Sequence, residues 1–344
     1  MLFDERPKKS RRELFEREVE LQQLANNIDR PLILLTGIRR IGKTSLLNVF
    51  LSEIGIPHIL IDARSLKRNY GVGDLYRLLA KGLTSNLDSI RDVLSKIRRV
   101  KIFGNEVELS WRGKEYIGLS ELFDELNRKR IIIAIDEAQL LRGPNSAEIK
   151  RAIAHSYDYN RNLTFILTGS EVGLLYDFLG VDDVSSPLFG RSYFELRLER
   201  FDRNTSLRFL ERGFEESGVR VDPLTLDEAV DEFDGIVGWL AFFGNKYLLG
   251  TRETASIKAL AVSIARKELR NLCSGRSSRL LTALKCISQD KHTWSELKRC
   301  IEDREGNTIS TSVLDNIVRT LENLSIIKDY QFIDPIYRKA AESV

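Results

Sequence analysis

The sequence predicts an α/β protein whose core is a parallel β-sheet between two layers of helices, followed by two smaller helical parts. Residues 11–200 alternate short apolar runs with longer segments of helical spacing. Continuous apolar strands separated by helices are typical of a parallel sheet that is covered on both faces. After residue 201 the strand signals fade and helical spacing dominates. With 344 residues, the chain exceeds what one hydrophobic core usually supports, so we expect more than one domain.

Five apolar runs are the expected strands of this sheet. They are short, rich in Ile, Leu and Phe, and span residues 32–36, 58–62, 131–136, 164–168 and 193–198. A further segment, residues 100–112, alternates apolar and polar residues around Gly104-Asn105, which indicates a β-hairpin with a tight turn. We therefore expect a hairpin inserted into the α/β domain.

The pattern predicts three domains: an α/β domain over residues 1–200, a helical lid domain over 201–275 and a winged-helix domain over 276–344. In the second domain, helical spacing recurs at residues 204–218, 225–233 and 239–249. The third domain starts with helices near residues 280–288, 294–301 and 310–324 and ends in a short hairpin at 326–333. Three helices followed by a hairpin indicate a winged helix.

A glycine-rich loop between the first strand and the helix expected at 45–54 carries the strongest functional signal. Residues 37–44 read Gly-Ile-Arg-Arg-Ile-Gly-Lys-Thr and fit the P-loop pattern G-x-x-x-x-G-K-[ST]. Gly37 and Gly42 let the backbone curl so that its N–H groups and the positive end of the following helix face phosphate oxygens. The sequence thus predicts a nucleotide site formed by Gly37, Ile38, Arg39, Arg40, Ile41, Gly42, Lys43, Thr44 and Ser45.

Four side chains are expected to act on the phosphates. Lys43 would neutralise the β- and γ-phosphates of ATP, and the Thr44 hydroxyl would bind Mg²⁺. The strand at 131–136 ends in Asp136 and Glu137, at the edge where open α/β sheets bind ligands. Asp136 would orient the Mg²⁺, and Glu137 would be the catalytic base that draws a proton from the attacking water. Alternatively, Asp136 caps the next helix and Glu137 is a surface carboxylate.

Hydroxyl groups and one arginine are further candidates. The strand at 164–168 ends in Thr168-Gly-Ser170, so either hydroxyl could sense the γ-phosphate or orient the attacking water, or the segment is simply a turn and helix cap. Arg191 precedes the last strand and could be an arginine finger that reaches a neighbouring subunit. A structural ion pair is the simpler interpretation of Arg191.

Several motifs occur in an order that resembles the archaeal ATPase family, within the AAA+-related STAND class of P-loop NTPases. They are the P-loop, the Asp-Glu-Ala-Gln sequence at 136–139, the turn at 168–171, and the segments at 186–191 and 235–239. The resemblance covers nearly the whole chain. It implies an AAA+-like, three-layer P-loop NTPase core with a helical lid and a winged helix. It also implies Mg²⁺-dependent ATP binding, slow hydrolysis to ADP and use of the nucleotide as a conformational switch.

Two more contacts with the nucleotide are implied by the resemblance. Residues 15–18, Phe-Glu-Arg-Glu, resemble the family's opening segment near the nucleotide base, which points to Arg17. The family usually has Gly-x-Pro-Gly where this chain has Gly-Ile-Val-Gly at 235–238. Val237 therefore stands where a proline is expected near the adenine. It can keep the apolar contact but lacks the fixed φ of proline.

The charge distribution favours a protein partner over DNA. The net charge is only +3, and residues 280–344 hold nine Lys or Arg against ten Asp or Glu. The helix at 310–324 carries Arg319 opposed by Asp315 and Glu322, so we expect the winged helix to contact the ATPase core, a protein partner or a second copy. Residues 251–279, with seven Lys or Arg and two Glu, are the best nucleic-acid candidate. The alternatives are an ATP-sensing DNA-binding regulator and a nucleotide-bound scaffold or antitoxin-like interaction protein.

Other classes of protein are not expected. No apolar run approaches the roughly 20 residues that span a bilayer, and the N-terminus lacks a secretory signal, so we expect a cytoplasmic protein without membrane contact. The three histidines are scattered and predict no metal site. Cys273, Cys286 and Cys300 are widely spaced, so we expect buried helix cysteines and no disulfide framework.

Overall fold

The chain divides into two compact units in the computed structural model, which describes residues 1–67, 69–97, 99–109 and 117–344. The sheet unit contains residues 17–37 and 43–198. The helical unit contains residues 1–16, 38–42 and 199–344. The division into three domains remains a prediction.

A five-stranded parallel sheet forms the centre of the sheet unit. Its order is β2-β5-β6-β1-β7, and the bounds are β1 (Leu32–Thr36), β2 (His58–Asp62), β5 (Ile131–Asp136), β6 (Leu163–Gly169) and β7 (Phe194–Arg197). Every residue of β1, β5 and β6 is buried, which explains why these strands read as unbroken apolar runs. The structure therefore confirms the predicted α/β core.

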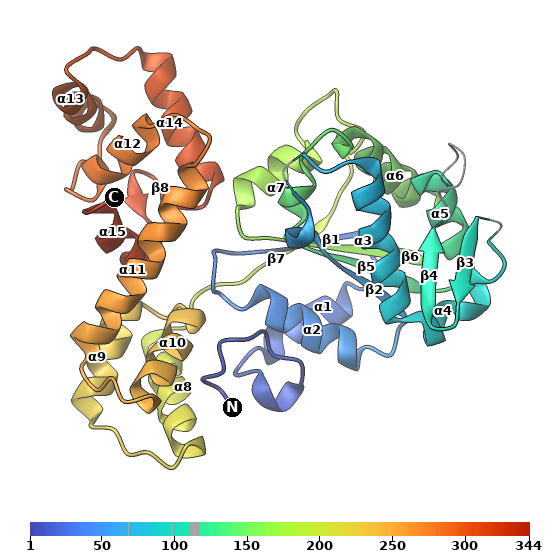
Figure 1. Ribbon diagram of the computed structural model, residues 1–344, viewed down its shortest axis with the longest axis horizontal. Coiled ribbons are helices and arrows are strands. Elements are labelled where there is room, and N and C mark those ends of the chain that lie inside the picture. The colour runs from blue at the N-terminus through green and yellow to red at the C-terminus, as the bar shows by residue number, and fades with distance from the viewer. Residues whose placement is uncertain (68, 98, 110–116) are drawn as a thin grey trace. The chain divides into compact units, whose positions relative to one another are not determined.

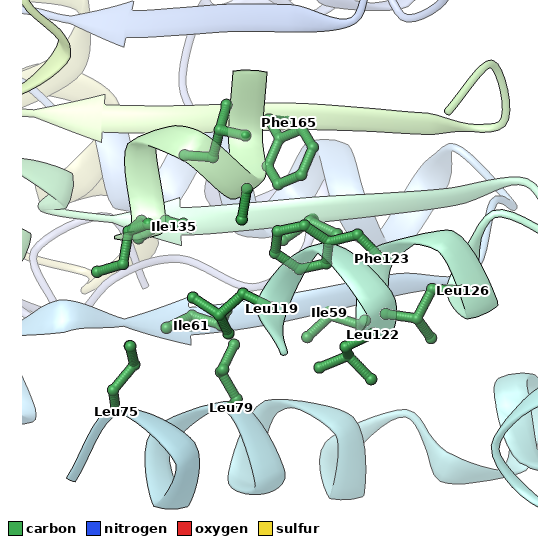
Figure 2. Close-up of a cluster of buried hydrophobic side chains, with 14 of the residues drawn as sticks. Ile59, Ile61, Leu75, Leu79, Leu119, Leu122, Phe123, Leu126, Ile135 and Phe165 are labelled. Atoms are coloured by element: carbon green, nitrogen blue, oxygen red, sulfur yellow. The ribbon is translucent and has the colours of Figure 1, made fainter. Parts of the chain in front are cut away.

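Helices cover the sheet on both sides (Figure 1). They are α1 (Glu18–Asn26), α2 (Lys43–Glu53), α3 (Val72–Ser85), α4 (Leu87–Leu94), α5 (Leu119–Leu126), α6 (Ser146–Tyr159) and α7 (Val172–Leu179). Figure 2 shows one side of the core, where α3 presents Leu75 and Leu79 to Ile61 of β2, and α5 presents Phe123 to Phe165 of β6. Each such buried side chain contributes about 1.5–3 kcal/mol relative to exposure in water. This packing holds the strand ends of the site in register.

The predicted hairpin is present in its described part. Strands β3 (Val100–Phe103) and β4 (Glu106–Leu109) pair antiparallel around Gly104, whose φ is +58°. The Val107 N–H donates to Thr84 Oγ1 of α3 at 3.0 Å, which ties the hairpin to the sheet unit. Residues 110–112 of the predicted segment lie outside the described residues.

Helices make up most of the second unit. They are α8 (Arg203–Glu216), α9 (Pro223–Phe233), α10 (Val237–Leu248), α11 (Thr254–Cys273), α12 (Arg279–Ile287), α13 (Trp294–Glu305), α14 (Thr311–Asn323) and α15 (Pro335–Ala341). A short hairpin, β8 (Ile327–Lys328) and β9 (Gln331–Phe332), follows α14. The order from α12 to β9 confirms the winged helix. Helix α15, which packs on α11, was not predicted.

The expectation about the cysteines is wrong for two of the three. Cys286 of α12 and Cys300 of α13 form a disulfide, whereas Cys273 is free and buried. The two helices pack against each other and bring the Cα atoms to 6.0 Å, within the range that a disulfide bridges. A separation of 14 residues along the sequence does not reveal that proximity.

None of the helices in the described residues is both long and apolar enough to cross a membrane.

Candidate active site

The carboxyl ends of neighbouring strands bring the predicted catalytic residues together. Strands β5 and β6 pair Ile135 with Leu167, so the next residues, Asp136 and Thr168, are neighbours at the sheet edge. Strand β1 ends at Thr36, beside β6, and leads into the P-loop. Strand β2 ends at Asp62, paired with Asp136. The site is therefore built from four adjacent strand ends.

The P-loop has the backbone shape that its glycines allow. Gly37 and Gly42 have φ values of +141° and +98°, in the region that favours glycine. Helix α2 begins at Lys43, whose buried ammonium donates to the Gly37 carbonyl oxygen at 2.8 Å. Lys43 is thus held across the loop, and the helix N-terminus faces the same turn. The nucleotide contacts predicted for residues 37–45 all remain predictions.

Asp136 is the centre of the polar cluster. It is 2% exposed, and its carboxylate accepts from Thr168 Oγ1 at 2.6 Å and from Thr44 Oγ1 at 3.0 Å. Arg64 Nη2 lies 3.0 Å from its Oδ2. Burial raises the pKa of Asp136, and the charge of Glu137 adds to this, whereas the hydrogen bonds and Arg64 oppose it. This carboxylate stays buried because several donors hold it.

Glu137 is fixed beside Asp136. Its backbone is left-handed, with φ +56°, and its N–H donates to Thr168 Oγ1 at 2.9 Å. Its Oε2 accepts from the Ser170 hydroxyl at 2.7 Å, from the Ser170 N–H at 3.2 Å and from Gln139 Nε2 at 2.6 Å. A non-glycine residue in this conformation is costly and is concentrated at functional sites. The donors from Ser170 and Gln139 therefore hold the Glu137 carboxylate in one orientation, which suits a proton acceptor.

The oxygen groups of Thr44 and Asp136 fit a magnesium ion. Carboxylate and hydroxyl oxygens are the ligands that Mg²⁺ prefers, and the ion usually keeps waters and substrate phosphates as its other ligands. In the described residues no group of three or more His, Cys, Asp or Glu could hold a metal by itself. The pair suits a metal that arrives with a nucleotide.

Two predicted site residues lie in ion pairs elsewhere in the sheet unit. Arg191 contacts Asp158 of α6, with Nε–Oδ1 at 3.1 Å and Nη2–Oδ2 at 2.5 Å. Arg17 is buried, and its Nη1 donates to Glu20 Oε1 at 2.5 Å. That Arg191 acts as an arginine finger and that Arg17 contacts the adenine base of the nucleotide remain predictions.

The tip of the P-loop, residues 38–42, packs within the helical unit. Val237, the first residue of α10, has its Cγ1 3.6 Å from the position that a Cβ on Gly42 would occupy. The Gly238 N–H donates to the Arg40 carbonyl oxygen at 2.9 Å. A Cβ on Gly238 would lie 2.6 Å from that of Arg40, so only glycine fits this approach. The family-implied residue Val237 therefore lies against the loop.

Arg40 is held by side chains of two helices, and a third helix supports one of these side chains. Its guanidinium donates to both carboxylate oxygens of Glu268 on α11, at 2.7 and 2.5 Å. It also lies 3.9 Å from the ring centroid of Trp239 on α10. The Tyr337 hydroxyl of α15 donates to Glu268 at 2.9 Å. One P-loop side chain thus connects to α10 and α11 and, through Glu268, to α15.

Sequence analysis missed two charged residues of these clusters. Arg64 follows the end of β2 by two residues, and this position at the sheet edge could have identified it. Glu268 lies in the middle of a long amphipathic helix, where its spacing to other residues carries no signal. The number of residues separating it from Arg40, 228, hides the pair.

Family comparison gives two matches. A model described as an ATPase domain predominantly from Archaea matches residues 14–242. A model of the MCM protein C-terminal winged helix-turn-helix domain matches residues 274–340. No curated protein matches the chain.

Solved structures provide a further comparison. A Walker-type ATPase of Pyrococcus abyssi is 34% identical with a TM-score of 0.84, and the match covers 99% of both chains. The Orc1 protein of Aeropyrum pernix, solved in complex with DNA, is 18% identical with a TM-score of 0.45 over 92% of this chain and 85% of that one. A RuvB variant of Thermotoga maritima is 15% identical with a TM-score of 0.46 over 94% and 92%. The family match and the Pyrococcus abyssi structure show that this chain belongs to the archaeal ATPase family, as a P-loop ATPase with a C-terminal winged helix.

Proposed function

We propose that the protein hydrolyses ATP to ADP in a Mg²⁺-dependent reaction, and that its nucleotide state controls the arrangement of the lid and the winged helix. One observation carries the catalytic part. Asp136 lies between the Thr44 and Thr168 hydroxyls, and Glu137 is locked beside it. This arrangement at the end of β5 supports our assignment of Asp136 as the carboxylate that orients the metal and of Glu137 as the base.

Each residue of the site has its own role in the proposed hydrolysis of ATP. Backbone N–H groups of residues 37–45 bind the phosphates, and Lys43 neutralises the β- and γ-phosphates. When bound, Mg²⁺ supplies positive charge at the phosphate oxygens, held by Thr44 and Asp136. Glu137 accepts the proton of the attacking water. Thr168 and Ser170 keep the two carboxylates in place, since each donates a hydrogen bond to one of them.

Variants of Glu137 test the catalytic proposal. Glu137→Gln keeps the shape but cannot accept a proton, so we expect unchanged ATP affinity by calorimetry and turnover lowered by about 10²- to 10⁴-fold. Glu53→Gln, at the exposed end of α2, is the matched control and should leave both unchanged. Turnover within about threefold of wild type in Glu137→Gln would remove Glu137 as the base.

The contacts of Arg40 support the switch. A P-loop residue that pairs with Glu268 offers a direct route from bound phosphate to α10, α11 and α15. ADP and ATP are expected to change amide hydrogen exchange in these three helices. In Glu268→Gln, which weakens the pair, this nucleotide-dependent difference should shrink while ADP affinity remains. Equal differences in the variant and wild type would contradict the coupling.

For the partner, we favour a protein or a second copy that binds the winged helix. On α14, Asp315 accepts from the Trp294 indole at 2.9 Å, and this helix carries only Arg319 as a cation. Such a surface attracts DNA poorly. A pull-down with ATP and with ADP tests for the partner in the proposed cytoplasmic setting. Salt-sensitive duplex binding that is lost on neutralising Arg266, Lys267 and Arg270 would instead support the DNA-binding alternative.

A further inference from the structure

Arg64 connects an exposed carboxylate to the buried Asp136. It lies in the turn just after β2, and it is paired side by side with Asp62, with Nε–Oδ1 at 2.8 Å and Nη2–Oδ2 at 2.9 Å. The same Nη2 also donates to Asp136 Oδ2 at 3.0 Å. Asp62 therefore aims the guanidinium at Asp136.

Arg64 makes an ion pair with Asp136. The uncharged hydroxyls of Thr44 and Thr168 also donate to this carboxylate. A buried carboxylate without a compensating charge is strongly disfavoured. Arg64 thus provides positive charge next to the buried Asp136 carboxylate.

The contact overlaps with the proposed metal site. Asp136 Oδ2 accepts from Arg64 and also from the Thr44 hydroxyl, the group assigned to Mg²⁺. A guanidinium and a divalent cation repel each other, so both cannot keep their closest approach to one oxygen. The Arg64 side chain is 49% exposed, whereas Asp136 is 2% exposed. Arg64 is the partner that can move aside, and exposed Asp62 can retain it.

We propose that Arg64 is a positioning residue that pairs with the Asp136 carboxylate and competes there with Mg²⁺. Arg64 thereby sets the magnesium concentration at which the site loads with Mg²⁺ and nucleotide. The inference rests on the proposed function, because it takes Asp136 and Thr44 as the magnesium site. It extends that function by assigning a role to a residue outside the P-loop and the β5 end.

The test is the Mg²⁺ concentration that half-saturates ADP binding, measured by calorimetry at fixed ADP. Arg64→Gln removes the charge, so this concentration should fall by about 3- to 10-fold, since the competing ion pair is lost. Arg64→Lys keeps the charge and should stay near wild type. Arg77→Gln is the matched control, because Arg77 is an exposed arginine paired with Asp74 on α3. Thermal melting with Mg²⁺ alone should give a larger stabilisation for Arg64→Gln than for wild type.

The possible outcomes separate the inference from the proposed function. An unchanged or increased magnesium requirement in folded Arg64→Gln overturns the inference. In the Asp136→Asn background, Arg64→Gln should no longer shift the magnesium requirement, because the carboxylate for which Arg64 and Mg²⁺ compete is gone. A shift as large as in the wild-type background would also overturn the inference. Should wild-type ADP binding be independent of Mg²⁺, the proposed magnesium site is wrong and the inference falls with it.

Discussion

The sheet unit and the helical unit each bury one aspartate, and they surround it differently. Asp136 is 2% exposed at an open strand end, where its donors are two hydroxyls and the movable Arg64. Asp334 is 6% exposed, accepts from the Trp239 indole at 2.8 Å, and caps α15 by accepting from the Ile336 N–H at 2.8 Å. Burial raises the pKa of both carboxyl groups. A raised pKa therefore does not identify the functional carboxylate.

The donors make the distinction. Backbone N–H groups and an indole cannot leave Asp334 without unfolding the start of α15 or exposing Trp239. In the proposed function, the hydroxyls and the half-exposed arginine around Asp136 give way to a metal and its waters. On that proposal, the partners of Asp136 are exchangeable, whereas those of Asp334 are a permanent part of the fold. Substitutions of Asp136 should therefore affect activity, whereas substitutions of Asp334 should affect stability.

Of the substitutions that test this comparison, the one at Asp136 is expected to have the largest effect, and that effect is on activity. Asp136→Asn keeps the shape and removes the buried charge, so we expect turnover to fall by about 10- to 100-fold. The melting temperature should be unchanged or higher, because a carboxyl group with a raised pKa costs stability when ionised. ATPase assays and thermal melting measure the two effects. A large loss of stability with little loss of turnover would make Asp136 a structural residue like Asp334.

The disulfide gives the helical unit a covalent tie of its own. Cys300→Ser opens the link between α12 and α13, and a loop of this length implies a loss of about 3 kcal/mol. Reductant should lower the melting temperature of the wild type and leave that of Cys300→Ser unchanged. Cys273→Ser, which keeps the disulfide, should respond to reductant as the wild type does. An absence of any response in the wild type would show that the two thiols are not linked in solution.

At Asp334 the expected effect is on stability alone. Asp334→Ala removes the cap of α15 and leaves the buried indole without an acceptor, which together cost about 2–4 kcal/mol. Asp334→Asn keeps the cap oxygen and loses only the acceptor for the indole, so it should cost less. Denaturant unfolding measures both variants. Equal losses in the two would mean that the indole contact, and not the cap, carries the stability.

The parts of the molecule that sequence analysis predicted are those with local signals. Strands β1, β5 and β6 are buried throughout, and the P-loop and the Asp136-Glu137 pair are short contiguous motifs. The contacts that sequence analysis did not predict join residues that are far apart in the sequence. Arg64 meets Asp136 after 72 residues and Arg40 meets Glu268 after 228. Helix α15 has only seven residues and owes its place to packing on α11. No periodicity encodes which surfaces will meet.

The smallest effect is expected from the pair of Glu268 with Arg40, and it depends on pH. Burial opposes ionisation of Glu268, but its hydrogen bonds to Arg40 outweigh this, so the pKa lies below its ordinary value of 4.5. A lowered pKa in the folded state means stability that is present above pH 4.5 and is lost as the pH falls through the folded pKa. Glu268→Gln should therefore cost about 1 kcal/mol near neutral pH.

The same variant shows whether Glu268 holds Arg40 through a pH-dependent ion pair or through packing alone. The difference in unfolding free energy between wild type and Glu268→Gln, measured by denaturant unfolding, should be constant above about pH 5. It should decrease as the pH falls below 4.5. A difference that stays constant down to pH 3 would mean that the glutamate acts through its shape and not its charge. Arg40 would then be held by Trp239 rather than by an ion pair, since the indole contact does not titrate.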